Sequence, residues 1–82
     1  MNKPVKESDF ISSQNQFIAW RNRKYRHGEC LMHHYDLQNG VLLEKWQCIN
    51  TENYQRETYI VEMYPDNNGF SVYYISDYYA GN

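Results

Sequence analysis

The segment Thr58–Ser76, TYIVEMYPDNNGFSVYYIS, decides the fold that we expect for this chain. Two runs rich in β-branched and aromatic residues, Thr58–Tyr64 and Phe70–Ser76, flank the loop Pro65–Gly69. Proline presets φ, aspartate and asparagine bond to nearby backbone, and glycine accepts positive φ, so the loop favours a turn. Strand, glycine-containing loop and strand in succession are typical of a β-hairpin.

The alternation of side chains along this hairpin predicts one apolar face and one mixed face. If the loop holds an even number of residues, the apolar face presents Tyr59, Val61, Met63, Phe70, Val72 and Tyr74. The mixed face then presents Ile60, Glu62, Tyr64, Ser71, Tyr73 and Ile75. We expect the apolar face to pack against a helix, because an isolated hairpin is only marginally stable in water.

That helix is predicted from about Asp9 to Arg26. Its apolar residues recur at helical spacing and are Phe10, Ile11, Phe17, Ile18 and Tyr25. Ser8 or Asp9 is the expected N-cap, and Gly28 is the expected stop. Residues 1–7 are expected to be loose, and residues 77–82 to form a tail with no assigned element.

A second hairpin is predicted from Glu29–Leu37 and Val41–Ile49, because Asn39-Gly40 between them is a strong turn signal. With a two-residue loop, the inner face holds Leu31, His33, Tyr35, Leu37, Leu42, Glu44, Trp46 and Cys48. The run from Val41 to Cys48 could also be helical, although its neighbours favour a strand. The expected architecture is one α+β domain over residues 1–82, in which an N-terminal helix packs on a four-stranded antiparallel β-meander in two layers.

Composition agrees with a small folded domain. The chain has 82 residues, of which only 16 are Leu, Ile, Val or Phe, but nine tyrosines and two tryptophans supplement this thin aliphatic core. The net charge of −2 argues against disorder and against a strongly basic nucleic-acid-binding domain. Residues 1–8 contain no apolar run, so we expect no signal peptide, a cytoplasmic location and reduced cysteines.

The cysteines and histidines do not form a convincing chemical motif. On a strand, Cys30 and His33 point to opposite faces, and a second closely spaced ligand pair is missing. Cys48 near His33 could resemble a nucleophile and its base, but no oxyanion-binding turn accompanies them. A two-residue loop would offset Cys30 and Cys48 onto different faces, whereas a three-residue loop would place them opposite each other. We therefore expect no metal, no cofactor and no enzymatic activity.

The favoured functional prediction is a protein-binding surface on the last hairpin and tail. Its acidic and aromatic residues are Glu62, Tyr64, Asp66, Tyr73, Asp77, Tyr78 and Tyr79. Tyrosine provides a large contact area at low entropic cost and is enriched at interfaces. The most concrete version is an inhibitor or immunity-type protein of a phage or other mobile element, acting on a nuclease or nucleoprotein. A homodimer contact through Ile60 and Ile75 is an alternative use of the same hairpin.

The second functional prediction is contact with RNA or DNA through the basic end of the helix. The residues concerned are Arg21, Arg23, Lys24, Tyr25 and Arg26. Such a segment could bind phosphates and stack an aromatic ring on a base. Basic residues at a helix C-terminus also stabilise the helix by themselves, so this composition does not require a ligand.

Overall fold

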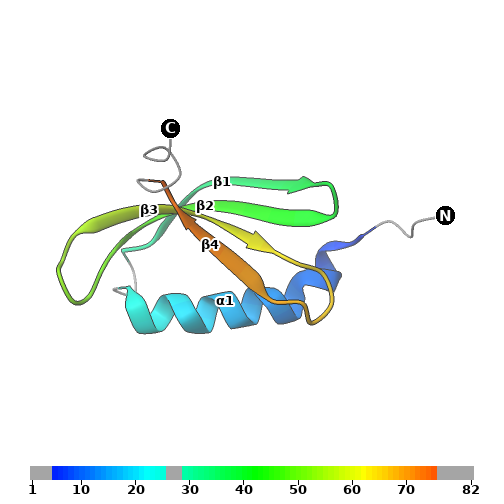
Figure 1. Cartoon of the computed structure of the whole chain (residues 1–82), viewed down its shortest axis with the longest axis horizontal. Coiled ribbons are helices and arrows are strands. Elements are labelled where there is room, and N and C mark those ends of the chain that lie inside the picture. The colour runs from blue at the N-terminus through cyan, green and yellow to red at the C-terminus, as the bar shows by residue number, and fades with distance from the viewer. Residues whose placement is uncertain (1–4, 26–28, 76–82) are drawn as a thin grey trace.

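The computed structural model describes residues 5–25 and 29–75 and confirms the α+β architecture. A helix lies along one side of a four-stranded antiparallel sheet whose strand order is β1-β2-β3-β4 (Figure 1). The elements are a 3-10 turn Glu7–Phe10, α1 Ile11–Lys24, β1 Leu31–Gln38, β2 Val41–Ile49, β3 Arg56–Met63 and β4 Phe70–Tyr74. The strands follow one another in space as they do in sequence, as predicted for a meander.

The β3–β4 hairpin has the register that its alternation predicts. Met63 pairs with Phe70 across a connection of even length, and Val61 pairs with Val72. Two loop residues, Asp66 and Gly69, adopt positive φ angles of 62° and 79°. The side chains of Tyr59, Val61 and Met63 are fully buried beneath α1, so the predicted apolar face is confirmed.

The β1–β2 hairpin turns at Asn39-Gly40, where φ is 52° and 75°, as a two-residue turn of the primed type requires. The segment from Val41 to Ile49 is a strand, so its helical alternative is wrong. The register shifts between Met32 and His34, and beyond this β-bulge Leu31 lies opposite Gln47.

The bulge changes which side chains of β1 face the helix. Leu31 and His33 leave the inner face on which they were predicted, and His33 Nε2 lies 3.1 Å from Gln47 Oε1 on the other side. Tyr35 and Leu37 keep the predicted face but are exposed, because α1 packs on β3 and β4 and does not extend over β1.

Aromatic residues dominate the core between α1 and the sheet. Its buried apolar members are Phe10, Phe17, Tyr25, Leu42, Cys48, Tyr59, Val61 and Met63. The Phe17 ring contacts four others, with centroid distances of 6.1 Å to Trp20, 5.9 Å to Trp46, 6.2 Å to Tyr59 and 5.8 Å to Phe70. The expectation that aromatic residues supplement a thin aliphatic core therefore holds.

Hydrogen bonds to segments outside the helix hold it at both ends. Near its start, the Asp66 N–H donates to Asp9 O at 2.7 Å, and Ser13 Oγ donates to Tyr64 O. The helix ends at Lys24 rather than Arg26, because Tyr25 is extended and forms a β-bridge with Asn50. The predicted stop, Gly28, lies outside the described residues.

The predicted N-cap and loose N-terminus also differ from the structure. The 3-10 turn begins at Glu7, and the Lys6 N–H donates to Asp9 Oδ2 at 2.9 Å, so neither Ser8 nor Asp9 is the cap residue. Val5 packs against the core, so the part of residues 1–7 that the structure describes is attached to the domain.

Candidate functional site

The sheet face opposite α1, here called the outer face, carries a hydrogen-bonded group of polar side chains. Tyr64 Oη donates to Glu62 Oε1 at 2.9 Å and lies 3.0 Å from Ser71 Oγ. Glu62 and Ser71 are cross-strand partners in the β3–β4 ladder, which explains why one tyrosine hydroxyl reaches both. Tyr73 follows Ser71 on the same face and is 43% exposed. We call Glu62, Tyr64, Ser71 and Tyr73 the tyrosine cluster.

The surroundings of Tyr64 keep its hydroxyl protonated. The hydrogen bond with Ser71 lowers the pKa of Tyr64, but partial burial and the hydrogen bond to Glu62 raise it, and the net pKa lies above the usual value. At neutral pH the hydroxyl therefore remains a donor, and the Glu62 carboxylate accepts its proton. This bond restrains both side chains before any partner arrives.

The remainder of the outer face combines apolar and charged side chains. Cross-strand pairing places Lys45 beside Ile60 and Ile60 beside Tyr73 in one row, and Leu43 beside Glu62 and Ser71 in the next. Within the described residues, the helix packs on the opposite face and no element covers this one (Figure 1). Because Lys45 lies among these residues, the described part of the face is aromatic and mixed in charge rather than predominantly acidic.

The other predicted members of this surface are not part of the cluster. Asp66 is exposed in the β3–β4 loop, where its backbone N–H binds Asp9. Asp77, Tyr78 and Tyr79 lie outside the described residues. The structure thus brings together Glu62, Tyr64 and Tyr73 of the predicted set, and it adds Ser71.

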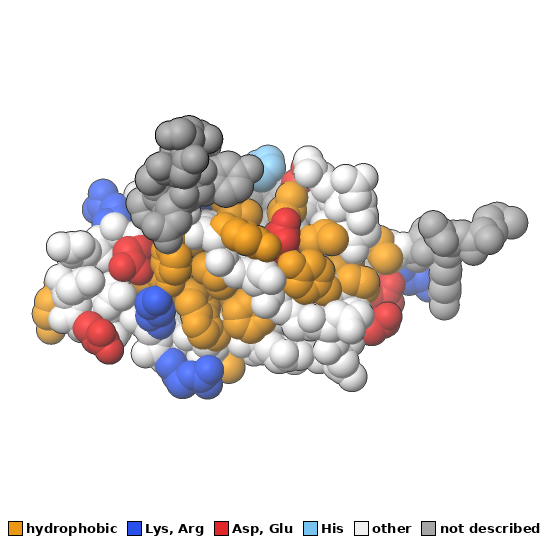
Figure 2. All heavy atoms as spheres, viewed as in Figure 1, with side chains coloured by type: hydrophobic (Ala, Val, Ile, Leu, Met, Phe, Trp, Pro, Cys, Tyr) orange, Lys and Arg blue, Asp and Glu red, His pale blue; other side chains and the backbone are white. Residues whose placement is uncertain are grey.

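The strand β4 forms one edge of the sheet, and its surroundings are apolar. Figure 2 shows hydrophobic side chains gathered across the middle of the molecule with an acidic side chain among them, and other charged side chains toward both ends. Phe70, Val72 and Tyr74 are half-buried, and their partner strand lies on one side only. The tyrosine cluster therefore adjoins an apolar strand edge, where an approaching protein could contact both side chains and backbone.

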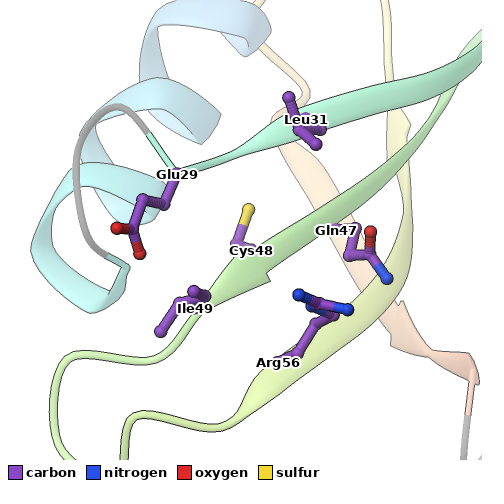
Figure 3. Close-up of a pocket in the computed structure, with 6 residues that line it drawn as sticks. All are labelled: Glu29, Leu31, Gln47, Cys48, Ile49 and Arg56. Carbon is purple, nitrogen blue, oxygen red and sulfur yellow. The ribbon is translucent and has the colours of Figure 1, made fainter.

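A small pocket lies near the opposite edge of the sheet. It has a volume of about 260 Å³ and is lined by Glu29, Leu31, Gln47, Cys48, Ile49 and Arg56 (Figure 3). Small-molecule sites usually have volumes of about 300–1,000 Å³ and convergent polar groups. The lining mixes a carboxylate, a guanidinium, an amide, a thiol and two aliphatic side chains, so it does not indicate a particular ligand.

The basic end of the helix is largely engaged by aromatic rings of the protein itself. Lys24 Nζ donates to Tyr74 Oη at 2.6 Å and lies 5.0–5.9 Å from the ring centroids of Tyr74, Trp20 and Tyr25. This hydrogen bond is the main reason that the pKa of Lys24 is raised. Arg21 Cζ lies 4.8 Å from the Trp46 ring centroid. These cations therefore contribute to the packing of α1 on the sheet.

Tyr25, predicted to stack on a base, is instead part of the core. It is 1% exposed, and its hydroxyl donates to Glu57 Oε1 at 2.9 Å and lies 3.1 Å from Tyr74 Oη. Its prediction as an exposed stacking residue is wrong, because the chain leaves the helix at this point and turns the ring inward. Arg23 is exposed, and it lines a pocket of about 350 Å³ with Trp20 and Lys24 among others. Arg26 lies outside the described residues.

Among the residues that the structure describes, Cys48 and His33 do not come together as the nucleophile and base that their sequence positions suggested. Cys48 points to the helix-facing side of β2, whereas His33 bonds Gln47 on the outer face. In residues 5–25 and 29–75, no group of three or more His, Cys, Asp or Glu side chains could hold a metal ion. No helix in the same part of the chain is long and apolar enough to cross a membrane.

The sequence did not indicate the network that joins Lys24, Tyr25, Glu57 and Tyr74. Its members come from the helix end and from two strands, so only the folded chain brings them together. Comparison with protein families, with curated proteins and with solved structures finds no match for this chain. Any functional conclusion therefore depends on the residues described above.

Proposed function

We propose that this protein is a non-enzymatic binding module that engages another protein through the tyrosine cluster and the adjoining β4 edge. The observation that carries the proposal is the outer face itself, where Tyr73 is 43% exposed beside half-buried Ile60 and Leu43. Aromatic anchors surrounded by weaker contacts are typical of the centre of protein interfaces.

Preorganisation supports this use of the surface. Tyr64 is restrained by Glu62 and Ser71, so little side-chain entropy remains to be lost when a partner binds. On the other side of β3, Tyr59 is fully buried under α1, so the strand that carries Glu62 is attached to the core. A rigid surface of this kind suits a small inhibitor.

The partner that best suits this surface is a protein with an apolar patch and a nearby basic group. The apolar patch would cover Ile60 and Tyr73, and the basic group would meet Glu62, whose carboxylate is already oriented. Residues 41–82 carry two basic and six acidic side chains, so their net charge also favours a basic partner. The most specific form of the proposal is therefore an inhibitor or immunity-type protein that binds a cytoplasmic nuclease or nucleoprotein, as mobile elements carry.

Affinity capture from lysate of the cells that express the protein tests this function. Wild type is compared with Tyr73→Ala and with the matched control Tyr35→Ala, whose ring is 42% exposed on the helix-facing side of β1. We expect a stoichiometric protein partner that survives nuclease treatment. Tyr73→Ala should weaken its binding by about 2 kcal/mol, roughly 30-fold in Kd, and Tyr35→Ala should leave it unchanged. Equal binding by all three proteins would exclude the tyrosine cluster as the interface.

A second candidate function is contact with nucleic acid at the end of α1. The observation in its favour is the pocket that Arg23 and Lys24 line together with Trp20. Arg23→Glu reverses an exposed charge without disturbing the rings that hold Lys24 and Arg21. If the protein binds nucleic acid, this variant should lose binding, and wild-type binding should fall steeply as salt is raised. A protein partner on the outer face should tolerate the same substitution.

A further inference from the structure

The β-bulge in β1 has a consequence for the two cysteines. With a regular two-residue hairpin, Cys30 and Cys48 would be offset onto different faces. After the register shift, Met32 lies opposite Trp46 and Leu31 lies opposite Gln47. Continuing the antiparallel ladder by one residue places Cys30 directly opposite Cys48, and both side chains then share the helix-facing side with Trp46.

Contacts agree with this placement. The Cys48 thiol interacts with Cys30, which helps to raise the Cys48 pKa, and its sulfur lies 3.4 Å from Tyr59 Oη. Figure 3 shows the Cys48 sulfur pointing toward the backbone of the neighbouring chain segment, between Glu29 and Leu31. Both residues are thiols in this structure, Cys48 is fully buried, and half-buried Cys30 packs against the same core.

The backbone geometry of opposed residues is suitable for a bond between the sulfurs. Directly opposite residues in an antiparallel pair have Cα atoms about 4.5 or 5.5 Å apart, depending on whether they exchange hydrogen bonds. Disulfides span Cα distances of about 4.4–6.8 Å. A disulfide can therefore form here with side-chain rotation and little movement of the strands.

We propose that Cys30 and Cys48 form a reversible intramolecular disulfide by exchange with a low-molecular-weight disulfide such as oxidised glutathione. This site does not depend on the proposed binding function, since its residues face the helix and the tyrosine cluster faces away from it.

The two exchange steps follow from the different exposure of the thiols. The Cys30 thiolate attacks one sulfur of the small disulfide, which breaks the S–S bond and releases one small thiolate. The Cys48 thiolate then attacks the Cys30 sulfur of the mixed disulfide, forming the Cys30–Cys48 bond and expelling the second small thiolate. Two electrons pass from the protein sulfurs to the small disulfide, and each released thiolate takes up a proton that a cysteine has lost.

The second step should be slow at neutral pH and faster in base. Burial and the contact with Cys30 raise the pKa of Cys48 to about 12, although the Tyr59 hydroxyl and the nearby Arg21 charge partly oppose this shift. Only the thiolate attacks, so its fraction, and with it the rate of ring closure, should rise about tenfold per pH unit between pH 7 and pH 10.

The disulfide should stabilise the β1 edge of the sheet. It would close a loop over residues 31–47 and join the beginning of β1 to β2, the strand with which β1 pairs. A closed loop of this length typically raises the melting temperature of a small domain by roughly 10 °C or more. The bond would thus change how firmly β1 is held without altering the outer face near β4.

The test uses the wild-type protein, incubated with oxidised or reduced glutathione at pH 7, 8 and 9. Intact mass should show the loss of two hydrogens rather than an added glutathione, independently of protein concentration. Proteolysis without reduction should give a peptide pair that contains Cys30 and Cys48, and the melting temperature should return to its original value on reduction. In Cys48→Ser, the expected product is a stable glutathione adduct at Cys30.

Two results would overturn the proposal. One is accumulation in wild type of the Cys30–glutathione adduct without ring closure at pH 9, which would mean that the sulfurs do not meet. The other is oxidation only to disulfide-linked dimers, whose yield grows with protein concentration. Because wild type carries both readouts, neither outcome depends on whether the serine variant folds.

Discussion

The substitution Tyr25→Phe separates the structural role of this tyrosine from the role in nucleic-acid stacking that its sequence context indicated. Phenylalanine keeps the ring that stacks on Tyr59, with a centroid distance of 5.4 Å and an interplanar angle of 16°. It removes only the hydroxyl, which donates to Glu57 Oε1 at 2.9 Å and lies 3.1 Å from Tyr74 Oη.

The expected cost follows from these two contacts. A hydrogen bond to a charged group contributes about 1.5–3 kcal/mol and a neutral one about 0.5–1.5 kcal/mol. Glu57 and Tyr74 are half-buried, so water can replace part of what they lose. We expect Tyr25→Phe to lower the free energy of unfolding by about 2 kcal/mol, which corresponds to roughly 8–16 °C in melting temperature for a domain of this size.

Urea titration followed by tryptophan fluorescence measures this loss, since Trp20 lies 5.7 Å from the Tyr25 ring. The control is Tyr54→Phe, because the Tyr54 side chain is 70% exposed and the same change there should cost less than about 0.5 kcal/mol. If Tyr25→Phe were as stable as this control, the hydroxyl would be solvated and the buried network described here would be incorrect.

Three further predictions concern stability. Burial first, and then hydrogen bonding, raises the pKa of Tyr25 and of Tyr59, so both stay protonated in the folded state above pH 10 while they ionise in the unfolded state. Stability should therefore fall by about 1.4 kcal/mol per pH unit from about pH 9, where Cys48 ionises only in the unfolded state, and the two tyrosines should add roughly 2.7 kcal/mol per pH unit above pH 10, as measured by urea titration at several pH values, whereas no steepening above pH 10 would mean that both rings are accessible. Gly40→Ala should lower the free energy of unfolding by about 1 kcal/mol in the same assay, because the φ of Gly40 is 75°, a conformation that disfavours alanine. No atom lies within 4 Å of the added carbon, so the loss comes from the backbone alone, and no loss would mean that the turn changes type. Ser13→Ala should lower the free energy of unfolding by about 1–2 kcal/mol, because it removes the buried hydroxyl that donates to Tyr64 O. A neutral result would show that water replaces the hydroxyl as the donor.

The sequence predicts the fold well where side-chain alternation and turn chemistry agree. Asn39-Gly40 and the loop before Phe70 fix two hairpins, and the alternation from Tyr59 to Met63 identifies the buried face. Glu62, Tyr64 and Tyr73 could be grouped on the other face for the same reason, since alternate residues of paired strands share a side.

The missed features depend on contacts between distant segments. The end of the helix at Lys24 is set by Thr51, whose N–H and hydroxyl both donate to Lys24 O, at 3.1 and 3.0 Å. Residues that favour the C-terminal end of a helix continue for several positions beyond Lys24, so local propensity alone predicts a longer helix. Tyr25 belongs to the apolar set that the helical spacing identifies, but it reaches the core from an extended segment that pairs with Asn50, and no local pattern indicates that bend.

The bulge between Met32 and His34 shows how one extra residue changes which side chains meet across two strands. A strand's side chains alternate with period two, so a shift of one residue exchanges every side chain beyond it between the two faces. Leu31 and His33 thereby leave the helix-facing side, and Cys30 moves onto it opposite Cys48. The same shift places His33 and Cys48 on opposite faces of the sheet, which argues against the hypothesis that they form a catalytic pair. It also brings the thiols of Cys30 and Cys48 together. Deleting His33 should remove the bulge but keep Met32 opposite Trp46 and Leu31 opposite Gln47, so Cys30 should stay opposite Cys48 and the intramolecular disulfide should still form. Because none of the contacts of β3, β4 and the tyrosine cluster passes through β1, these should stay in place, and loss of the disulfide in this variant would refute the register argument.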